Sequence, residues 1–518
     1  MLSPWTGLPV AMVGQAGPRE MERALEAASL AEPALAAWPR HARAAVLAEV
    51  ARLLRRDGEL LAGMIVREAG KPLRFARLEV DRAVRTFAWA AVEALQPLGE
   101  AHAMDVEPGG EDYLARTERF PVGVVAAITP FNFPLNLVAH KVAPAVAAGN
   151  PVIVKPPPQA PSAALHLGRL VVEAGAPPAS IQVLPCGADV AQALATDPRV
   201  KLLSFTGSDA VGWKLRALAS GRRCVLELGG DAAAVVHGDA DLEWAAVRLA
   251  LGAFLYAGQV CISVQRVLVE RGALRRFARL FAHAAEDLAV GDPADPATVV
   301  GPMIDAAAQD RVRSWTAEAV RGGAKTLLAA ERRGPVLTPC ILEDAPGDSR
   351  LAREEVFGPV ALVEGYDDFE AALDRVNHSR YGLQAAVFTS DPGRAERAFR
   401  RLEVGAVVVN DYPTLRFDHL PYGGVKASGQ GREGVRAAMR EMTEPRLLLQ
   451  RVPGISAPGR PAVAAEPPGA APRAIGIGPR EGDEEHRSGV AAPAAAGSPA
   501  GGARPGKRRR RRGGRSHR

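Results

Sequence analysis

The sequence has few cysteines and no long apolar run. Its 518 residues contain four cysteines and no CxxC pair; the cysteines are Cys186, Cys224, Cys261 and Cys340. Such scattered thiols exclude a disulfide scaffold and do not predict a zinc site, so we expect no metal. No apolar run reaches the roughly 18 residues of a membrane span, and the first residues do not resemble a signal peptide. We therefore predict a cytoplasmic protein that does not contact a membrane.

Positive charge is concentrated near the C-terminal end. Lys and Arg number 64 and Asp and Glu 58, but residues 455–518 alone hold 13 basic and 5 acidic residues. The rest of the chain is slightly acidic, which argues against a basic nucleic-acid-binding core. After Gly454 the composition changes to Pro, Ala, Gly and Arg, so we predict a disordered tail over 454–518. Its basic block can contact polyanions weakly, but we favour a solvated tail without such a partner.

Apolar patterns predict a helical opening and then two α/β units. Residues 17–98 are rich in Ala, Leu, Glu and Arg, with apolar residues at helical spacing. Short β-branched runs then alternate with helical segments over 121–208 and again over 232–409, which indicates parallel sheets with crossover helices. Two segments of mixed character, 113–122 and 444–452, flank these units. They fit either a small antiparallel arm or an edge strand in each unit.

Three residues far apart in the chain have the chemistry of a covalent catalyst. Cys261, in FLYAGQVCIS, is a nucleophile when ionised, although a single cysteine is more often a small core residue. Glu227, in LELGGD, ends an apolar strand and is either a base or a surface charge. Asn132, in ITPFNFPLN, follows a predicted strand and is either an oxyanion donor or a turn residue. Together they supply a nucleophile, a base and an oxyanion donor near strand ends.

From about residue 5 to residue 452 the chain resembles the aldehyde dehydrogenase superfamily. The resemblance is carried by TPFNFP (129–134), VIVKP (152–156), FTGS (205–208), ELGG (227–230), GQVC (258–261), EEVFGPV (354–360) and PYGGVKASGQGRE (421–433). It implies an α/β fold with two doubly wound domains and a β arm for bridging and oligomerisation. The expected boundaries are 1–103 with 121–229 for the cofactor domain, 230–441 for the catalytic domain, and 104–120 with 442–453 for the arm. Relatives assemble through this arm, so we expect a homodimer or homotetramer.

The resemblance implies oxidation of an aldehyde to a carboxylic acid in two halves. The Cys261 thiolate attacks the aldehyde, and the Asn132 amide holds the oxyanion of the thiohemiacetal. After hydride transfer, Glu227 activates the water that hydrolyses the thioester. Lys141 and Glu433 match positions implicated in proton relay in some relatives, although a structural ion pair explains them equally well.

The resemblance also implies a dinucleotide site without a GxGxxG fingerprint. Gly207 and Ser208, at the start of a helix, match a pyrophosphate contact. The expected cofactor-binding residues are Thr129, Pro130, Phe131, Lys155, Gly207, Ser208, Gly212, Leu228, Glu355 and Phe357. NAD-preferring relatives often carry a glutamate three residues after the motif lysine, but this chain has Pro158 there. That change removes an acceptor for the ribose 2′-hydroxyl and a charge that repels a 2′-phosphate, so both NAD and NADP are expected cofactors.

The branch that the chain most resembles contains lactaldehyde, non-phosphorylating glyceraldehyde-3-phosphate and phosphonoacetaldehyde dehydrogenases. Phosphate-binding members often place an arginine directly before the nucleophile, whereas this chain has Val260, which argues against a phosphorylated substrate. The expected substrate residues are His140, Phe133, Val260 and Arg416. We predict a small polar or anionic aldehyde.

Two other functions fit parts of the sequence. A CoA-acylating dehydrogenase uses the same nucleophile, but such enzymes typically lack the base that Glu227 provides. A binding protein that kept the fold without catalysis does not need Asn132, Glu227, Cys261 and Glu355 together. Both alternatives are therefore less favoured than hydrolytic aldehyde oxidation.

Overall fold

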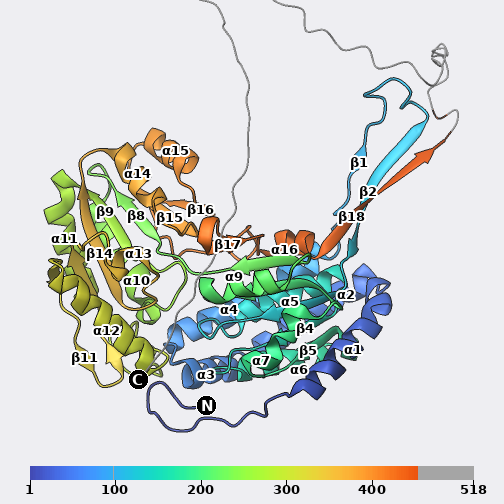
Figure 1. Cartoon of the computed structure of the whole chain (residues 1–518), viewed down its shortest axis with the longest axis horizontal. Helices are drawn as coiled ribbons and strands as arrows, with labels where there is room; N and C mark the ends of the chain where they lie inside the picture. The colour runs from blue at the N-terminus through green and yellow to red at the C-terminus, as the bar shows by residue number, and fades with distance from the viewer. Residues whose placement is uncertain (97, 453–454, 456–518) are drawn as a thin grey trace, which may run out of the picture. The chain divides into compact units, whose positions relative to one another are not determined.

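Four helices open the chain, as the apolar spacing predicts. The computed structural model describes residues 1–96, 98–452 and 455, so the predicted disordered tail lies outside the described residues except for Ile455. The opening helices are α1 (Pro18–Ala36), α2 (Arg40–Arg56), α3 (Gly58–Ala69) and α4 (Leu73–Glu93) (Figure 1). In α2 the apolar residues Val46, Leu47, Val50 and Leu54 are buried because they recur on one face.

A six-stranded sheet follows, in the order β17-β7-β6-β3-β4-β5. Its strands are β3 (Val124–Ile128), β4 (Val152–Lys155), β5 (Ile181–Val183), β6 (Val200–Thr206), β7 (Arg223–Glu227) and β17 (Gly429–Gln430). All neighbours are parallel except β17, which is antiparallel to β7. The connecting helices are α5 (Asn136–Ala148), α6 (Ser162–Glu173), η1 (Pro178–Ser180), α7 (Ala188–Ala191), α8 (Ala193–Thr196) and α9 (Asp209–Leu218).

A seven-stranded sheet forms the second unit, in the order β10-β13-β14-β9-β8-β15-β16. Its strands are β8 (Ala233–Val236), β9 (Arg266–Glu270), β10 (Lys325–Leu328), β13 (Cys340–Glu343), β14 (Val360–Tyr366), β15 (Gln384–Phe388) and β16 (Ala406–Val409). Only the β10–β13 pair is antiparallel. The remaining elements of this part of the chain are α10 (Leu242–Phe254), η2 (Leu255–Gly258), α11 (Arg271–Glu286), α12 (Ala306–Arg321), β11 (Arg332–Arg333), β12 (Val336–Leu337), α13 (Arg350–Arg353), α14 (Phe369–Asn377), α15 (Pro392–Arg401) and η3 (Lys426–Ser428).

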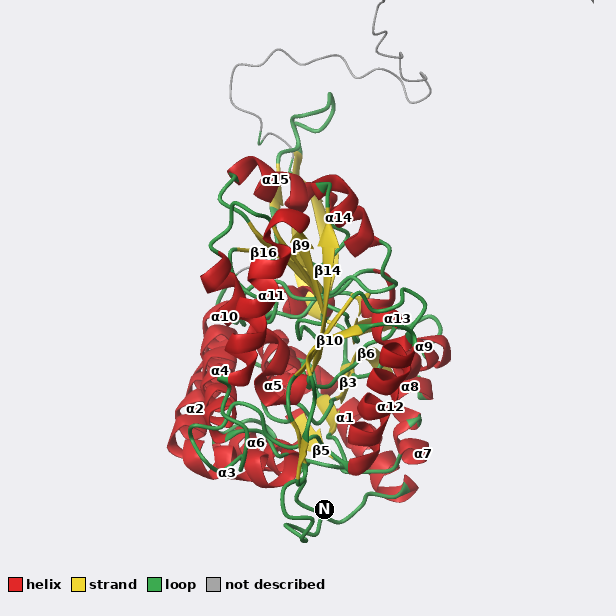
Figure 2. Cartoon of the chain, turned by 90° about the vertical axis from the view of Figure 1, so that its left-hand side faces the viewer, coloured by secondary structure: helices red, strands yellow, loops and turns green. Residues whose placement is uncertain are grey.

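Both sheets are covered by helices on their two faces (Figure 2). Successive side chains of a strand point to opposite faces. In β3, Val125 and Ala127 enter the core that contains α2 to α6, while Val124 and Ala126 enter the core that contains α1. In β8 the same alternation divides the strand between two cores. This arrangement confirms the predicted pair of doubly wound α/β units.

The two flanking segments form one antiparallel arm. β2 (Tyr113–Pro121) pairs along its whole length with β18 (Thr443–Arg451), and β1 (Ala101–His102) pairs with the other side of β2 (Figure 1). The prediction of an arm is thus confirmed over the alternative of separate edge strands. Every residue of β18 after Thr443 is exposed.

The segment between the second sheet and the arm returns to the first unit. It contributes β17 and the helix α16 (Val435–Glu441). Val435 and Met439 of this helix belong to the core that contains α4 and α5. None of the described helices is both long and apolar enough to cross a lipid bilayer.

Candidate active site

The three side chains predicted to carry the chemistry line one cavity. Asn132, Glu227 and Cys261 all contribute to its wall, and its volume is about 440 Å³. Asn132 follows β3 and Glu227 ends β7, and because both strands flank β6, their carboxyl ends lie side by side. Cys261 comes instead from the connection between α10 and β9. The cavity is therefore built by both sheets.

The loop that carries Cys261 has an unusual backbone. After α10 ends, Tyr256 and Ala257 adopt left-handed φ angles of 52° and 55°. Residues with side chains rarely adopt such angles, and those that do cluster at functional sites. Gly258 follows with φ 70°, and a Cβ there would lie 2.2 Å from the carbonyl oxygen of Gly358. The turn that leads to Cys261 therefore requires glycine at position 258.

Gln259 connects this loop to Asn132. Its side chain donates to the carbonyl oxygens of Tyr256 and Pro302, each at 3.2 Å, and accepts from the Ile304 N–H at 2.8 Å. Its own carbonyl oxygen accepts a hydrogen bond from Asn132 Nδ2 at 2.9 Å. A side-chain amide has two N–H groups. Asn132 is thus fixed beside the nucleophile with a second N–H for another acceptor.

A buried ion pair holds the backbone of Asn132. Lys71 donates to the Asn132 carbonyl oxygen at 2.9 Å and to Glu79 at 2.6 Å. The other carboxylate oxygen of Glu79 accepts from the N–H groups of Leu135 and Asn136, at the start of α5. Burial lowers the pKa of Lys71 to about 8, although Glu79 opposes this effect. This pair was not predicted from the sequence, because neither Lys71 nor Glu79 lies in one of the family motifs.

Tyr422 touches the nucleophile directly. Its hydroxyl lies 3.2 Å from Cys261 Sγ, and its side chain is buried. Burial raises the pKa of the Cys261 thiol to about 11, while the hydrogen bond with Tyr422 acts in the opposite direction. Tyr422 belongs to the PYGG part of a family motif, but no role was predicted for it from the sequence.

Glu227 lies in the cavity without a bonding partner for its carboxylate. The residue is 2% exposed, and among the described residues neither carboxylate oxygen has a hydrogen-bond partner. Burial raises the pKa of Glu227 well above 4.5, and the negative charge of Glu433 raises it further. A carboxylate with such a pKa is suited to take a proton near neutral pH.

Lys141 and Glu433 form a buried ion pair of 2.8 Å. Lys141 also donates to Ser204 Oγ at 3.0 Å, and Arg416 donates to the second carboxylate oxygen of Glu433 at 3.0 Å. Burial alone would raise the pKa of Glu433, but the two cations outweigh it and lower this pKa. Glu433 is therefore ionised at neutral pH. The ion pair is present, and a role in proton transfer stays a prediction.

A second cavity of about 370 Å³ adjoins the first and shares five residues with it: Pro130, Phe131, Thr206, Gly207 and Ser208. Thr129 and Lys155 line its far part. Gly212 lies behind the wall, where a Cβ would lie 2.3 Å from the side chain of Leu228.

The cavity wall includes groups suited to a dinucleotide. The hydroxyls of Thr129 and Thr206 are buried and have no hydrogen-bond partner in the described part of the chain. Ser208 precedes α9 and makes no side-chain capping bond, and helix N-termini attract phosphate groups, although here Asp209 Oδ1 already accepts from the Ala210 N–H. The two joined cavities therefore fit NAD or NADP.

Glu355 and Phe357 also line the first cavity. Glu355 accepts a hydrogen bond from the Gly230 N–H at 3.1 Å, and burial raises the pKa of Glu355 to about 8. A Cβ at Gly229 would lie 2.3 Å from its carboxylate, so glycine permits this approach. Phe357 has a left-handed φ of 45° and meets Phe131 edge to face, with ring centroids 5.9 Å apart.

Three of the four predicted substrate residues lie near the nucleophile. Val260 and Phe133 belong to a small apolar cluster with Cys261 and Tyr422. The Arg416 guanidinium lies over the Tyr422 ring, 3.8 Å from its centroid. Its Nε is buried and has no hydrogen-bond partner among the described residues.

His140 is separate from this group. It is fully buried and bonds to Asp418 at 2.8 Å, and, like the other three, it is not among the residues that line the cavity around Cys261. Burial lowers the pKa of His140, and the nearby charge of Arg416 lowers it further. Its imidazole is therefore neutral near pH 7 and supplies no positive charge for a substrate.

The family profile described as "Aldehyde dehydrogenase family" matches residues 1–448. The chain belongs to the aldehyde dehydrogenase family. Among its relatives, a 3-sulfolactaldehyde dehydrogenase from Priestia aryabhattai is 42% identical, with 87% of this chain and 94% of the relative covered. A lactaldehyde dehydrogenase from Methanocaldococcus jannaschii is 38% identical, with 83% and 92% covered.

Solved structures of aldehyde dehydrogenases have the same fold. Aldehyde dehydrogenase 21 from Physcomitrella patens, in complex with succinate, has a TM-score of 0.85 and 39% identity, with 88% of this chain and 95% of that chain covered. The glyceraldehyde-3-phosphate dehydrogenase GapN from Methanocaldococcus jannaschii, complexed with NADP, has a TM-score of 0.83 and 35% identity, with 87% and 98% covered. The predicted family, fold and NAD(P)-dependent aldehyde oxidation are confirmed, whereas the roles of individual residues stay predictions.

Several residues of this aldehyde dehydrogenase's cavity were not predicted. Arg311 and Trp315 of α12 line it, as do Asp209 and Tyr381. Arg311 also donates to the Val356 carbonyl oxygen at 2.8 Å, next to Glu355 in sequence. The sequence of α12 carries no signal for this placement, because its polar residues look like those of any solvated helix face.

Proposed function

We propose that this enzyme oxidises a small anionic aldehyde to a carboxylic acid, with Cys261 as the nucleophile and water as the final acyl acceptor. The observation that carries the proposal is that the thiol, the Asn132 amide and the unpaired Glu227 carboxylate line one cavity beside a cleft suited to a dinucleotide.

In the first half, the Cys261 thiol loses its proton to solvent, and the thiolate sulfur bonds to the aldehyde carbon. Asn132 Nδ2 donates to the oxygen, which becomes negative as the carbon becomes tetrahedral. The chemistry that NAD or NADP supplies when bound is acceptance of the substrate's hydride. Loss of that hydride and re-formation of the carbonyl leave a thioester on Cys261.

In the second half, Glu227 takes a proton from a water molecule in the cavity. The resulting hydroxide attacks the thioester, the carbon–sulfur bond breaks, and the acid leaves with Cys261 as a thiolate.

A base at position 227 favours water over CoA. Product analysis tests this: we expect the free acid at equal rates with and without CoA, whereas acyl-CoA formed only with CoA would contradict it.

An anionic substrate is supported by the relatives and by Arg416. Relatives are named for 3-sulfolactaldehyde, aspartate semialdehyde and sulfoacetaldehyde. In this chain Arg416 is a buried cation beside Tyr422, which touches Cys261, and its Nε makes no hydrogen bond within the described residues and lies 3.9 Å from Asp418. A charge-assisted hydrogen bond from this group would bind a sulfonate or carboxylate.

Initial rates on a panel of aldehydes test the substrate class. We expect a higher kcat/KM for sulfoacetaldehyde and succinic semialdehyde than for propanal and hexanal. The Arg416→Gln variant should lose about tenfold to a hundredfold in kcat/KM on the anionic aldehydes, because a hydrogen bond to a charged group contributes about 1.5–3 kcal/mol. The loss on propanal should be smaller. A preference for hexanal in the unaltered enzyme would disprove the proposal.

We further propose that the enzyme accepts NADP. Lys155 and Lys214 line the second cavity, and no carboxylate is among its described lining residues. Pro158, where NAD-preferring relatives often have glutamate, also lines it and cannot repel a 2′-phosphate. Initial rates with each cofactor at several concentrations check this, and a complete absence of activity with NADP would refute it.

We propose that the enzyme is a homodimer or homotetramer that assembles through its exposed arm. Leu447 and Leu449 of β18 are 63% and 52% exposed, and the edge strand β16 also leaves Val409 43% exposed. Unpaired strand edges with apolar side chains favour association between chains. We place the assembled enzyme in the cytoplasm, a compartment that suits its four free thiols.

A further inference from the structure

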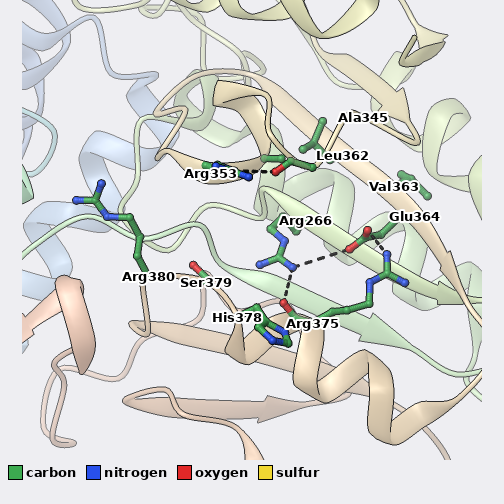
Figure 3. Close-up of a pocket in the computed structure, with 12 residues that line it drawn as sticks. Arg266, Ala345, Arg353, Leu362, Val363, Glu364, Arg375, His378, Ser379 and Arg380 are labelled. Atoms are coloured by element: carbon green, nitrogen blue, oxygen red, sulfur yellow. Dashed lines mark hydrogen bonds and ion pairs between the residues drawn. The ribbon is translucent and has the colours of Figure 1, made fainter. Parts of the chain in front are cut away.

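A cavity outside the active site is lined by arginines. It has a volume of about 480 Å³ and lies at the second sheet, against β9, β14 and the end of α14 (Figure 3). Four arginines line it: Arg266, Arg353, Arg375 and Arg380. Leu362 and Val363 add apolar surface, and Glu364 is the one carboxylate among the described lining residues. No step of the proposed reaction uses this cavity.

The charges around the cavity are not all matched. Arg375 pairs with Glu364, and Arg266 lies 3.3 Å from Asp231 and 3.9 Å from Glu364. Arg353 differs, because it has no acidic partner among the described residues and its Nε donates only to the carbonyl oxygen of Gly347. The Arg353 guanidinium therefore lacks a carboxylate partner, and three further guanidinium groups line the same cavity. This excess of positive charge favours an anionic ligand.

The arginine-lined cavity shares a wall with the active site. Arg353 lines it, and the next residue, Glu354, lines the active-site cavity. The same holds for Arg380 and the next residue, Tyr381. Arg380 also forms ion pairs with Glu354 and with Asp209, both of which line the active-site cavity. One side chain therefore connects the two cavities electrostatically.

We propose that the arginine-lined cavity binds a small molecule that carries a tetrahedral oxyanion group, a phosphate or a sulfonate, and that this ligand weakens cofactor binding. The planar guanidinium groups present paired N–H donors that match the oxygens of such a group. An anion near Arg380 competes with Asp209 and Glu354 for its guanidinium. Their negative charges then act more strongly on an anionic dinucleotide in the neighbouring cavity.

The binding test is a calorimetric titration of the full chain with inorganic phosphate. Sodium chloride keeps the ionic strength constant throughout. We expect saturable binding that persists when the dinucleotide cleft is filled with NADP. The Arg353→Ala variant should bind phosphate about tenfold more weakly, since it loses a charged donor, and Arg353→Lys should recover part of the loss. Basal activity without phosphate should stay unchanged.

The matched control is Arg332→Ala. Arg332 is also exposed and also donates through Nε to a nearby carbonyl oxygen, that of Gly334, but it does not line the cavity. This variant should bind phosphate as the unaltered enzyme does. If Arg353→Ala binds phosphate equally well, or if NADP abolishes the binding, the proposed site is wrong.

A second measurement tests the coupling and separates the two ligand sources. Saturating phosphate should raise the KM for NADP by about threefold or more at constant ionic strength, with less effect on kcat. Arg353→Ala should need about tenfold more phosphate for the same rise, and an unchanged KM in the unaltered enzyme would overturn the coupling. Methanesulfonate replaces phosphate in a parallel series. Binding of only one anion identifies the ligand group, and failure of both overturns the proposal. Neither result depends on which aldehyde the enzyme oxidises.

Discussion

At the residue scale, the hydroxyl of Tyr422 controls how readily Cys261 ionises. Burial raises the pKa of this thiol to about 11, and the hydrogen bond from Tyr422 lowers it. In Tyr422→Phe the pKa should rise further, so less thiolate is present at any pH below it. Alkylation by iodoacetamide at pH 8 should slow by about tenfold if the pKa rises by one unit.

Tyr381→Phe is the control for this comparison. Tyr381 also lines the cavity, but its hydroxyl lies 3.4 Å from Asp209 and does not touch the thiol. Its alkylation profile should match that of the unaltered enzyme. Equal rates for all three proteins between pH 7 and 9 would show that Tyr422 does not tune the nucleophile.

Glu227 determines the second half of the reaction and its pH dependence. Because burial and Glu433 raise the pKa of Glu227, its basic form is lost as pH falls through that raised value, and turnover should fall with it. In Glu227→Gln the steady-state rate should drop by about a hundredfold to ten-thousandfold. A burst of one NAD(P)H per active Cys261 should remain in stopped-flow traces. Loss of the burst together with the steady rate would assign Glu227 to the first half instead.

At the scale of elements, the Lys71–Glu79 pair fixes the loop between β3 and α5. Lys71→Met leaves Glu79 as a buried unpaired charge, so unfolding free energy should fall by about 3–5 kcal/mol in urea denaturation. The double variant Lys71→Met with Glu79→Gln removes that charge and keeps an acceptor for the α5 N–H groups, and should recover most of the stability.

Measurements of kcat distinguish the effect of the Lys71–Glu79 pair on the position of Asn132 from its effect on stability. The double variant still lacks the hydrogen bond from Lys71 to the Asn132 carbonyl oxygen. Its kcat should therefore stay several-fold low while the KM for NADP is little changed, since the cleft for the dinucleotide is untouched. A double variant with normal kcat would limit Lys71 to a structural role.

The strands differ in how well the sequence could predict them. Runs such as Val124–Ile128 and Val152–Lys155 are short, β-branched and bounded by helical segments, so their order as parallel strands follows from pattern alone. β17 has two residues, Gly429 and Gln430, and no pattern of that length indicates a strand. Its pairing with β7 depends on contacts between segments about 200 residues apart.

At the scale of the whole molecule, the motifs predicted the members of the site but not their connections. Asn132, Glu227 and Cys261 were found because each has a distinctive local sequence. The two bonds that hold Asn132 join distant parts of the chain and involve residue types that are common on surfaces: Lys71 donates to its carbonyl oxygen, and its side-chain amide donates to the Gln259 carbonyl oxygen. The substrate role of His140 stays a prediction, and its bond to Asp418, 278 residues away in the chain, is likewise a contact that no motif indicates.

The arm exposes a continuous run of apolar side chains. Three consecutive leucines of β18, Leu447, Leu448 and Leu449, are 63%, 44% and 52% exposed, although apolar side chains gain about 25 cal/mol for each Å² removed from water. Changing all three to glutamine keeps the β2–β18 backbone pairing and removes that gain. Sedimentation should show a dimer or tetramer for the unaltered enzyme and a smaller species for the variant.

The matched control changes three exposed leucines outside the arm to glutamine: Leu30, Leu60 and Leu78. Unaltered enzyme that sediments as a monomer, or an arm variant that keeps the full assembly, would remove the arm from the interface.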